Sequence, residues 1–273
     1  MFIRHRALNL FLAACGAAVV VAAAALAQEK AYEPVPGQAG KDAVWVPTPF
    51  ATVEKMLDVA KITPDDLAID LGSGEGRMVI AAAKRGARAI GVEFEDKLVQ
   101  LSRDLAKKAG VADKATFVQG DMFAYDISQA TVMPLFLLPE HFQKLTPKFL
   151  NLKPGTRIVI NTFRIPNWDP DETTKAEGDC GNWCTVHLWI VPAKVAGTWR
   201  LDKTELRLTQ EFQKVYGTLL IGGKRVPISD GRLRGDNISF SVGKTKYSGR
   251  VDGNSMTGEL SGGATGKWSA ARK

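Results

Sequence analysis

Three glycines at alternate positions follow an acid in the stretch "DLGSGEG", which begins at Asp70. Gly72, Gly74 and Gly76 would let a ligand approach the backbone closely, because glycine has no side chain and tolerates positive φ. The dinucleotide fingerprint is G-x-G-x-x-G, and the spacing here is one residue shorter. An acid in front of the turn repels a pyrophosphate. We therefore expect a ligand with cationic character rather than a nicotinamide dinucleotide.

Two further acids, Glu93 and Asp121, come at the ends of the predicted strands 88–94 and 115–121. The carboxyl ends of parallel strands meet at one edge of a sheet, where ligands bind. Glu93 suits a pair of ribose hydroxyls as a charged acceptor, and Asp121 suits an adenine amino group. S-adenosylmethionine (SAM) combines these groups with a sulfonium and an ammonium. The predicted cofactor-binding residues are Asp70, Gly72, Ser73, Gly74, Gly76, Glu93 and Asp121.

Apolar runs and helical periodicities alternate over the segment that carries these residues. Strands are predicted at 67–71, 88–94, 115–121, 131–138 and 156–163, and helices at 50–61, 77–85, 96–109 and around 142–145. Strands that alternate with helices indicate right-handed crossovers and a parallel sheet covered on both faces. The predicted fold is a doubly wound, Rossmann-like α/β domain.

The pattern changes at about residue 195. Residues 195–273 hold 13 of the 26 glycines, and their apolar residues alternate with polar ones, which predicts an all-β antiparallel meander, as a sandwich or partial barrel. This part carries 14 Lys and Arg against 7 Asp and Glu, a net +7, whereas residues 28–194 carry 20 against 22, a net −2. It has no histidine or cysteine, so we expect docking, dimer contact, acceptor recruitment or association with an anionic membrane surface. A solvated face explains the same charge.

Basic and apolar segments follow each other at the N-terminus. Arg4 and Arg6 precede a long apolar run that ends in "ALA" at residues 25–27, which predicts a secretory signal over 1–27 and a linker or surface arm over 28–46. An uncleaved inner-membrane anchor and a lipoprotein box ending at Cys15 are the alternatives. Each of them places the body of the protein outside the cytoplasm, periplasmic or secreted.

Removal of the signal leaves two cysteines, Cys180 and Cys184. In an oxidising compartment we expect them to form a disulfide. Two reduced thiols are the alternative, and a zinc site that adds His187 lacks a fourth ligand, so no metal is expected.

The motifs "DLGSGEG", "GVE" and "GD", in this order, resemble the class I SAM-dependent methyltransferases. More narrowly, "VPTP", "GRMVIAAA", "GVEFEDKLVQLSR" and "FRIPNWDPD" are similar to the protein-lysine methyltransferases whose eukaryotic members modify the mitochondrial ATP synthase and the adenine nucleotide translocase. The resemblance covers about residues 46–192. It implies a seven-stranded sheet over 47–194, SAM as cofactor and a protein lysine as acceptor. Glu75 stands where that family usually has Asp, a change that should preserve binding.

Methyl transfer requires positioning of the acceptor more than acid–base groups. Glu140 and His141 are the candidate catalytic residues, as a holder of an ammonium group and as a base, although both would also suit the start of a surface helix. Phe163 and Trp168 could line an acceptor channel or belong to the core. Thr48 and Pro49 could close over the cofactor or start the helix that follows. The alternative function is a binding or scaffold protein that keeps the fold without turnover. No nucleic-acid partner is expected, and the oligomeric state is open.

Overall fold

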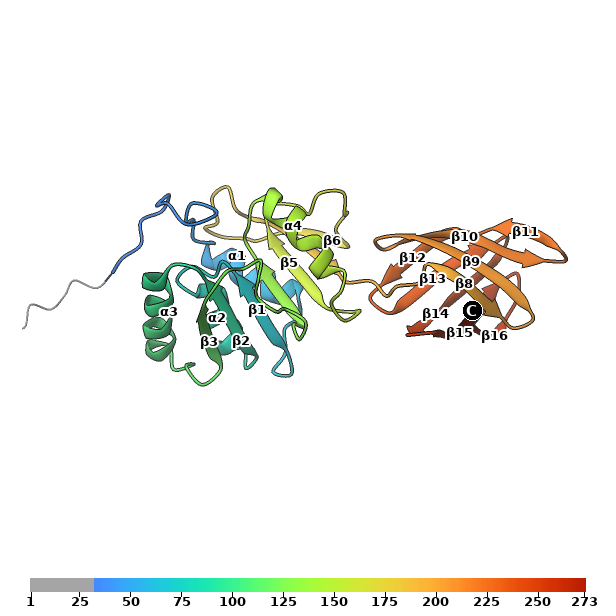
Figure 1. The fold of residues 1–273 in the computed structure, drawn as a ribbon, viewed down its shortest axis with the longest axis horizontal. Helices are drawn as coiled ribbons and strands as arrows, with labels where there is room; N and C mark the ends of the chain where they lie inside the picture. Colours follow the sequence, from blue (N-terminus) through green and yellow to red (C-terminus); the bar gives the residue numbers. More distant parts are fainter. Residues whose placement is uncertain (1–31) are drawn as a thin grey trace, which may run out of the picture. The chain divides into compact units, whose positions relative to one another are not determined.

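The structure is a computed structural model that describes residues 32–273 (Figure 1). The predicted signal over 1–27 and Cys15 lie outside the described residues. Within 32–273 we find no helix with the length and apolar character needed to cross a membrane.

A seven-stranded sheet forms the first half of the described chain and confirms the predicted α/β class. Its strand order is β3-β2-β1-β4-β5-β7-β6. The first five strands pair in parallel, whereas β7 runs antiparallel to both β5 and β6, so the sheet is mixed rather than fully parallel. The strands are β1 (Leu67–Leu71), β2 (Arg88–Glu93), β3 (Ala115–Gln119), β4 (Val132–Leu135), β5 (Arg157–Asn161), β6 (Glu172–Lys175) and β7 (Thr185–Ile190).

Helices cover both faces of this sheet. They are α1 (Phe50–Val59), α2 (Arg77–Lys84), α3 (Asp96–Lys108) and α4 (Pro139–Phe149). The buried side chains of α1, α2 and α3 join one apolar cluster, and those of α4 join a second cluster with Ile69 and Leu71 of β1. Gly76 starts α2 with φ 81°, and a Cβ at this position would overlap the Phe117 ring, so this position requires glycine.

The all-β part forms a closed ring of antiparallel strands. Eight strands pair in the cyclic order β10-β12-β13-β14-β15-β16-β8-β9, with β9 returning to β10, and β11 extends the β10 hairpin. Closure removes the exposed edges that an open meander would keep. Trp199 and Trp268 lie in its interior cluster. The strands are β8 (Gly197–Leu201), β9 (Thr204–Glu211), β10 (Lys214–Ile221), β11 (Lys224–Pro227), β12 (Ser229–Arg234), β13 (Asn237–Val242), β14 (Thr245–Asp252), β15 (Ser255–Gly262) and β16 (Gly266–Arg272).

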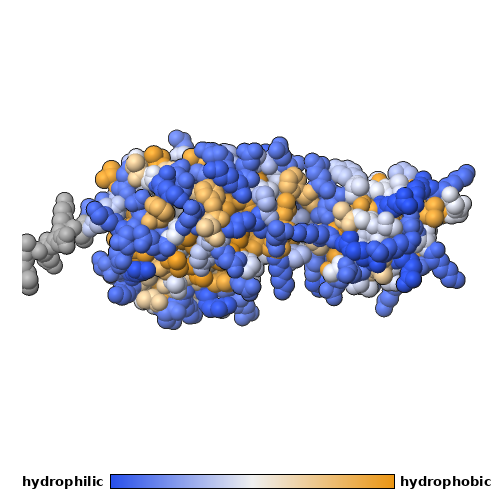
Figure 2. Space-filling model, in the orientation of Figure 1, coloured by the Kyte–Doolittle hydropathy of each residue, from blue (hydrophilic) through white to orange (hydrophobic). Residues whose placement is uncertain are grey.

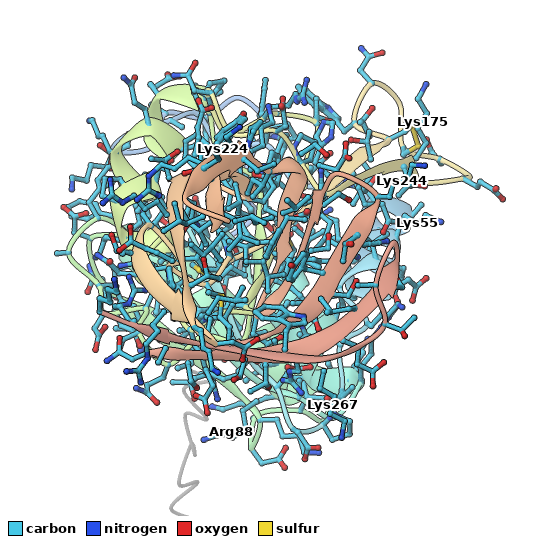
Figure 3. The ribbon with its side chains drawn as sticks, turned by 90° about the vertical axis from the view of Figure 1, so that its right-hand side faces the viewer. Lys55, Arg88, Lys175, Lys224, Lys244 and Lys267 are labelled. Carbon is cyan, nitrogen blue, oxygen red and sulfur yellow. A yellow bond between two sulfur atoms is a disulfide. The ribbon has the colours of Figure 1, made fainter. Side chains whose placement is uncertain are left out.

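Charged side chains cover the outside of this barrel. Hydrophilic residues occupy most of its surface on the face drawn in Figure 2. Lys224, Lys244 and Lys267 are exposed, and Figure 3 labels them around the barrel strands. The net charge of +7 is thus presented to solvent.

Candidate functional site

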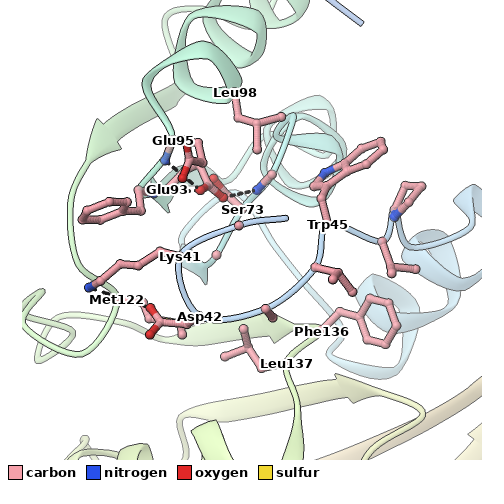
Figure 4. A pocket seen from close by; sticks show the side chains of 18 of the residues that line it. Lys41, Asp42, Trp45, Ser73, Glu93, Glu95, Leu98, Met122, Phe136 and Leu137 are labelled. Carbon is pink, nitrogen blue, oxygen red and sulfur yellow. Dashed lines mark hydrogen bonds and ion pairs between the residues drawn. The ribbon is translucent and has the colours of Figure 1, made fainter. Parts of the chain in front are cut away.

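A cavity of about 280 Å³ lies at the carboxyl ends of the parallel strands (Figure 4). Its walls come from the glycine turn after β1, the ends of β2, β3 and β4, the segments after β5 and before β7, and the chain before α1. This is the edge of an open α/β sheet at which ligands bind. Of the predicted cofactor-binding residues, Gly72, Ser73, Gly74, Glu93 and Asp121 line the cavity.

Glu93 holds the glycine turn against the end of β2. Its Oε2 accepts the Gly74 N–H at 2.9 Å, and its Oε1 accepts the N–H groups of Phe94 at 2.8 Å and Glu95 at 3.0 Å. A carboxylate has about four acceptor positions, and these N–H groups take three of them. Glu93 therefore fixes the turn, and about one of its acceptor positions stays unused by these N–H groups.

Asp121 lies after β3, the neighbour of the strand that ends at Glu93. Its Oδ1 accepts the Phe123 N–H at 2.7 Å, and its Oδ2 accepts from Lys41 Nζ at 2.7 Å. The hydrogen bond from Lys41 is the largest of the effects that lower the pKa of Asp121. Asp121 is thus ionised at neutral pH and can accept an amino group of a ligand.

Asp70 lies behind the cavity wall rather than in it. Its side chain is buried, 1% exposed, and neither carboxylate oxygen has a hydrogen-bond partner among the described residues. Burial raises its pKa well above the usual value, and the charges of Glu93 and Glu75 add to the shift. The raised pKa favours the neutral carboxylic acid, and a cationic ligand group beside it would favour the ionised form. Gly76 also lies outside the cavity lining, because it belongs to the packing of α2 against Phe117.

The raised pKa of Asp70 predicts that the stability of the folded protein depends on pH. Because its pKa is raised by folding, the unfolded chain binds fewer protons at this site, and stability falls as the pH rises from about 4 through the raised pKa. We expect the ligand-free Asp70→Asn variant to melt about 2–4 °C higher than the wild type at pH 8, a shift that corresponds to ~1 kcal/mol, and no higher at pH 4. Thermal melts at both pH values check this. An equal difference at the two pH values would contradict the buried charge.

The segment before α1 forms a loop over the glycine turn. The Gly37 N–H donates to the Trp45 carbonyl at 2.8 Å, and the Trp45 N–H donates to the Gln38 carbonyl at 2.9 Å, so the loop between them has closed ends. Trp45 Nε1 donates to Glu75 Oε2 at 3.1 Å, and a Cβ on Gly74 would lie 2.7 Å from Trp45 Nε1. We call residues 37–48 the arm loop. The sequence predicted a linker or surface arm here and gave no signal that this loop lines the cavity.

Aromatic side chains line the end of the cavity opposite Asp121. Two alternatives were predicted for Phe163 and Trp168: Phe163 lines the cavity, whereas Trp168 belongs to the core, where it is 1% exposed and stacks on Phe212. Phe136 and Trp183 complete the aromatic end, and neither was predicted from the sequence. Trp183 stands between two cysteines in the sequence, and that position was its one visible signal.

Neither predicted catalytic residue lines the cavity. Glu140 is exposed in the first turn of α4, and His141 is buried against the Phe123 ring at a centroid distance of 5.9 Å. The geometry supplies no contact between them and the cavity, so their catalytic role stays a prediction. Thr48 does line the cavity, and its carbonyl accepts a hydrogen bond from Arg77.

A disulfide joins Cys180 and Cys184, with their Cα atoms 5.1 Å apart. It closes the loop between β6 and β7 that carries Trp183. His187 lies in β7 instead, where its Nδ1 is 2.9 Å from Thr173 Oγ1. Within residues 32–273, no three His, Cys, Asp or Glu side chains are grouped so that they could hold a metal ion.

Comparisons with known proteins place this site in a family. Residues 70–172 match the model of the ANTKMT methyltransferase domain. A protein-lysine N-methyltransferase of Saccharolobus islandicus is 42% identical over 150 residues, and the match covers 54% of this chain and 92% of that protein. The ATP synthase lysine N-methyltransferase of mouse is 37% identical over 131 residues, but the match spans only 53% of that protein and 48% of this chain.

A solved structure gives the same result for the fold and the ligand. The RNA methyltransferase from Salinibacter ruber, in complex with S-adenosyl-L-homocysteine (SAH), is 46% identical, with a TM-score of 0.51. The match covers 55% of this chain and 96% of that chain. SAM is the cofactor, as predicted. The chain belongs to the ANTKMT methyltransferase-domain family and is a class I SAM-dependent methyltransferase.

Proposed function

We propose that this protein transfers the methyl group of SAM to a lysine amine of a protein. One observation carries the proposal. The cavity has acids at the β2 and β3 end, and only apolar and aromatic walls at the β4 and β5 end. The first end suits a nucleoside and the second suits a long aliphatic side chain. The names of two similar proteins support a lysine acceptor.

The residues present fit SAM. Asp121 would hold the adenine amino group, and Glu93 would accept the ribose hydroxyls. The glycine turn, including Ser73, would pass beside the methionine part, where a cation would stabilise the charged form of the buried Asp70 carboxyl, which has no hydrogen-bond partner among the described residues. When bound, SAM supplies a methyl group on a positively charged sulfur. The task of the chain is to orient the acceptor and exclude water.

The acceptor amine must be neutral to react. Burial among apolar walls lowers the pKa of a lysine and favours the neutral form, so a dedicated base is not required. This agrees with the positions of Glu140 and His141 outside the cavity lining.

The contact between Lys41 and Asp121 predicts that Lys41 modestly weakens the binding of the cofactor. Its ammonium occupies Asp121 Oδ2, the atom that we assign to adenine, and the pair is exposed. We expect Lys41→Ala to bind SAM about two- to fivefold more tightly at low salt, with the difference fading at high salt. Titration calorimetry measures it, with Lys108→Ala, on the exposed surface of α3, as control. Weaker binding by Lys41→Ala would show that Lys41 closes over the cofactor instead of competing with it.

Transfer to RNA is the second candidate, because the similar Salinibacter ruber protein is named as an RNA methyltransferase. Charge argues against it. Residues 28–194, which hold the cavity, carry 20 basic and 22 acidic residues, whereas nucleic-acid binding relies on neutralising phosphates with Lys and Arg.

One labelling experiment separates these functions. The protein is incubated with SAM labelled in its methyl group and with a cell extract, and the products are split into protein and RNA fractions. We expect label in protein and methylated lysine after acid hydrolysis. Label in methylated nucleosides would favour RNA. No transfer by a protein that binds SAM would favour a scaffold that keeps the fold without turnover.

We also propose that the protein acts outside the cytoplasm. The basic start, the apolar run and the "ALA" site support export, and a disulfide persists in an oxidising compartment. N-terminal sequencing of the exported protein should begin at Gln28. An intact Met1 in the soluble fraction would contradict cleavage.

The barrel is proposed as a recruiting domain. Its exposed positive charge supports an acidic acceptor protein or an anionic membrane surface as its partner. Co-sedimentation of the protein with vesicles that contain anionic lipid, at low and high salt, distinguishes the two partners.

A further inference from the structure

Three aromatic rings face one another at the β4 and β5 end of the cavity. Phe136 follows β4, Phe163 follows β5, and Trp183 lies in the loop before β7. The Phe136 and Phe163 rings are 5.9 Å apart between centroids with planes 15° apart. The Trp183 ring is inclined to both. Its centroid lies 5.2 Å from that of Phe136 with planes 65° apart, and 6.1 Å from that of Phe163 with planes 55° apart. All three side chains are partly buried and line the cavity.

The backbone directly before Phe163 has an unfavourable conformation and is held by a hydrogen bond. Thr162, directly before Phe163, has φ 63°, an unfavourable conformation for a β-branched residue, and its N–H donates to the Thr185 carbonyl at 2.7 Å. Backbone strain of this kind clusters at functional sites. The turn fixes the direction in which Phe163 leaves β5.

Trp183 is held by the disulfide loop. The Trp183 N–H donates to the Cys180 carbonyl at 2.8 Å, and the disulfide closes the loop at Cys184. The buried Thr52 of α1 donates its hydroxyl to the Trp183 carbonyl at 2.8 Å. The position of Trp183 thus depends on one covalent bridge and on contacts of its own backbone.

We propose that Phe136, Phe163 and Trp183 form the acceptor subsite for an amine, and that the Cys180–Cys184 disulfide positions Trp183 in it. We call these rings the aromatic trio. This inference rests on the proposed lysine acceptor. Ring faces attract an ammonium or methylated ammonium group, because the π-system is negative above the ring. The trio therefore suits a lysine amine and its methylated products.

The distribution of charge supports the assignment. Among the described residues that line the cavity, the acids come from the arm loop, the glycine turn and the ends of β2 and β3, and none comes from the segments that carry the trio. A carboxylate beside the amine would stabilise the unreactive ammonium form. The trio attracts the cation more weakly, so the amine can lose its proton, and the methylated product still has a favourable site.

The binding test uses two probes that differ in charge. Choline and 3,3-dimethylbutan-1-ol have nearly the same shape, but only choline is a cation. We expect SAH-loaded protein to bind choline about three- to thirtyfold more tightly than the alcohol, as measured by titration calorimetry. Equal binding of the two probes would overturn the aromatic subsite. This readout needs no methyl transfer, so an acceptor other than lysine would be detected separately by the labelling experiment.

Variants of Trp183 locate the site of binding. We expect Trp183→Ala to lose most of the preference for choline while SAH affinity stays within about twofold, and Trp183→Phe to keep part of the preference. Tyr216→Ala, which removes an exposed aromatic ring on the barrel, serves as the matched control and should behave as the wild type. A preference for choline that survives in folded Trp183→Ala, or a parallel loss of SAH binding, would overturn the role of Trp183.

The role of the disulfide has its own test. In the Cys180→Ser, Cys184→Ser double variant, we expect choline affinity to fall about three- to tenfold, with SAH affinity unchanged. Reduction of the wild type should have the same effect, and the same reductant should leave the double variant unaffected. Mass spectrometry shows whether the wild type is fully reduced. If the fully reduced protein still binds choline with its original affinity, the disulfide does not position Trp183.

Discussion

Gly74→Val should weaken SAM binding by more than about a hundredfold, which corresponds to about 2.7 kcal/mol. Gly74 has φ 56°, its N–H donates to Glu93, and its carbonyl accepts from Ser102 Oγ at 3.0 Å. A β-branched side chain resists this φ and would displace Trp45, because the added Cβ would lie 2.7 Å from Trp45 Nε1. It would also fill the space that the cofactor needs. Calorimetric titration with SAM measures the loss.

Gly110→Val is the matched control. Gly110 also has positive φ, 70°, but nothing lies within 4 Å of an added Cβ, and it follows α3 away from the cavity. The two variants share the backbone strain and differ in their contact with the site. We expect Gly110→Val to lose some stability and to bind SAM as the wild type does. A folded Gly74→Val protein with wild-type affinity would remove the glycine turn from the cofactor site.

Glu93→Ala should reduce SAM affinity about ten- to a hundredfold. Loss of hydrogen bonds to a charged group costs about 1.5–3 kcal/mol, and this range corresponds to that change in affinity. The structure adds a second cause, because Glu93 accepts three backbone N–H groups and Ala leaves them without this partner. Asp104→Ala, on the exposed surface of α3, is the control for removal of one acid. Circular dichroism confirms that each variant is folded.

A ligand without the ribose 2′-hydroxyl separates the two roles of Glu93. The wild type should bind 2′-deoxy-SAH more weakly than SAH, and Glu93→Ala should bind both alike, since the partner of the hydroxyl is already lost. If the variant still discriminates between the two ligands, Glu93 acts only by shaping the turn. Comparing both proteins with both ligands isolates the contact between Glu93 and the 2′-hydroxyl, because the substitution and the change of ligand each remove that contact.

The predictable parts of the fold and site are local in sequence. The glycine turn, the acids at the ends of three strands and the helices between them are each read from one short, continuous stretch of sequence. The antiparallel direction of β7 and the closure of the barrel are not local. The pairing of β16 with β8, for example, joins Arg272 to Trp199, residues that no periodicity relates.

The site residues that were not predicted also depend on contacts between distant parts of the sequence. Lys41 and Trp45 lie in a stretch without apolar periodicity, and only its placement over the glycine turn brings Lys41 to Asp121, 80 positions away in the sequence. The two cysteines predict a closed loop but give no direction for Trp183, which follows from the backbone contacts of that loop with α1. His141 shows the opposite case. Its chemistry suggested a base, but the packing of α4 buries it against Phe123.

A crystal structure of the protein with bound SAH would show directly which end of the cavity holds the nucleoside. We expect the adenine amino group at Asp121, the ribose hydroxyls at Glu93, and the sulfur turned toward the aromatic trio, with Lys41 displaced from Asp121. A ligand bound in the reverse direction, with adenine stacked between Phe136, Phe163 and Trp183, would contradict the assignment of both ends of the cavity.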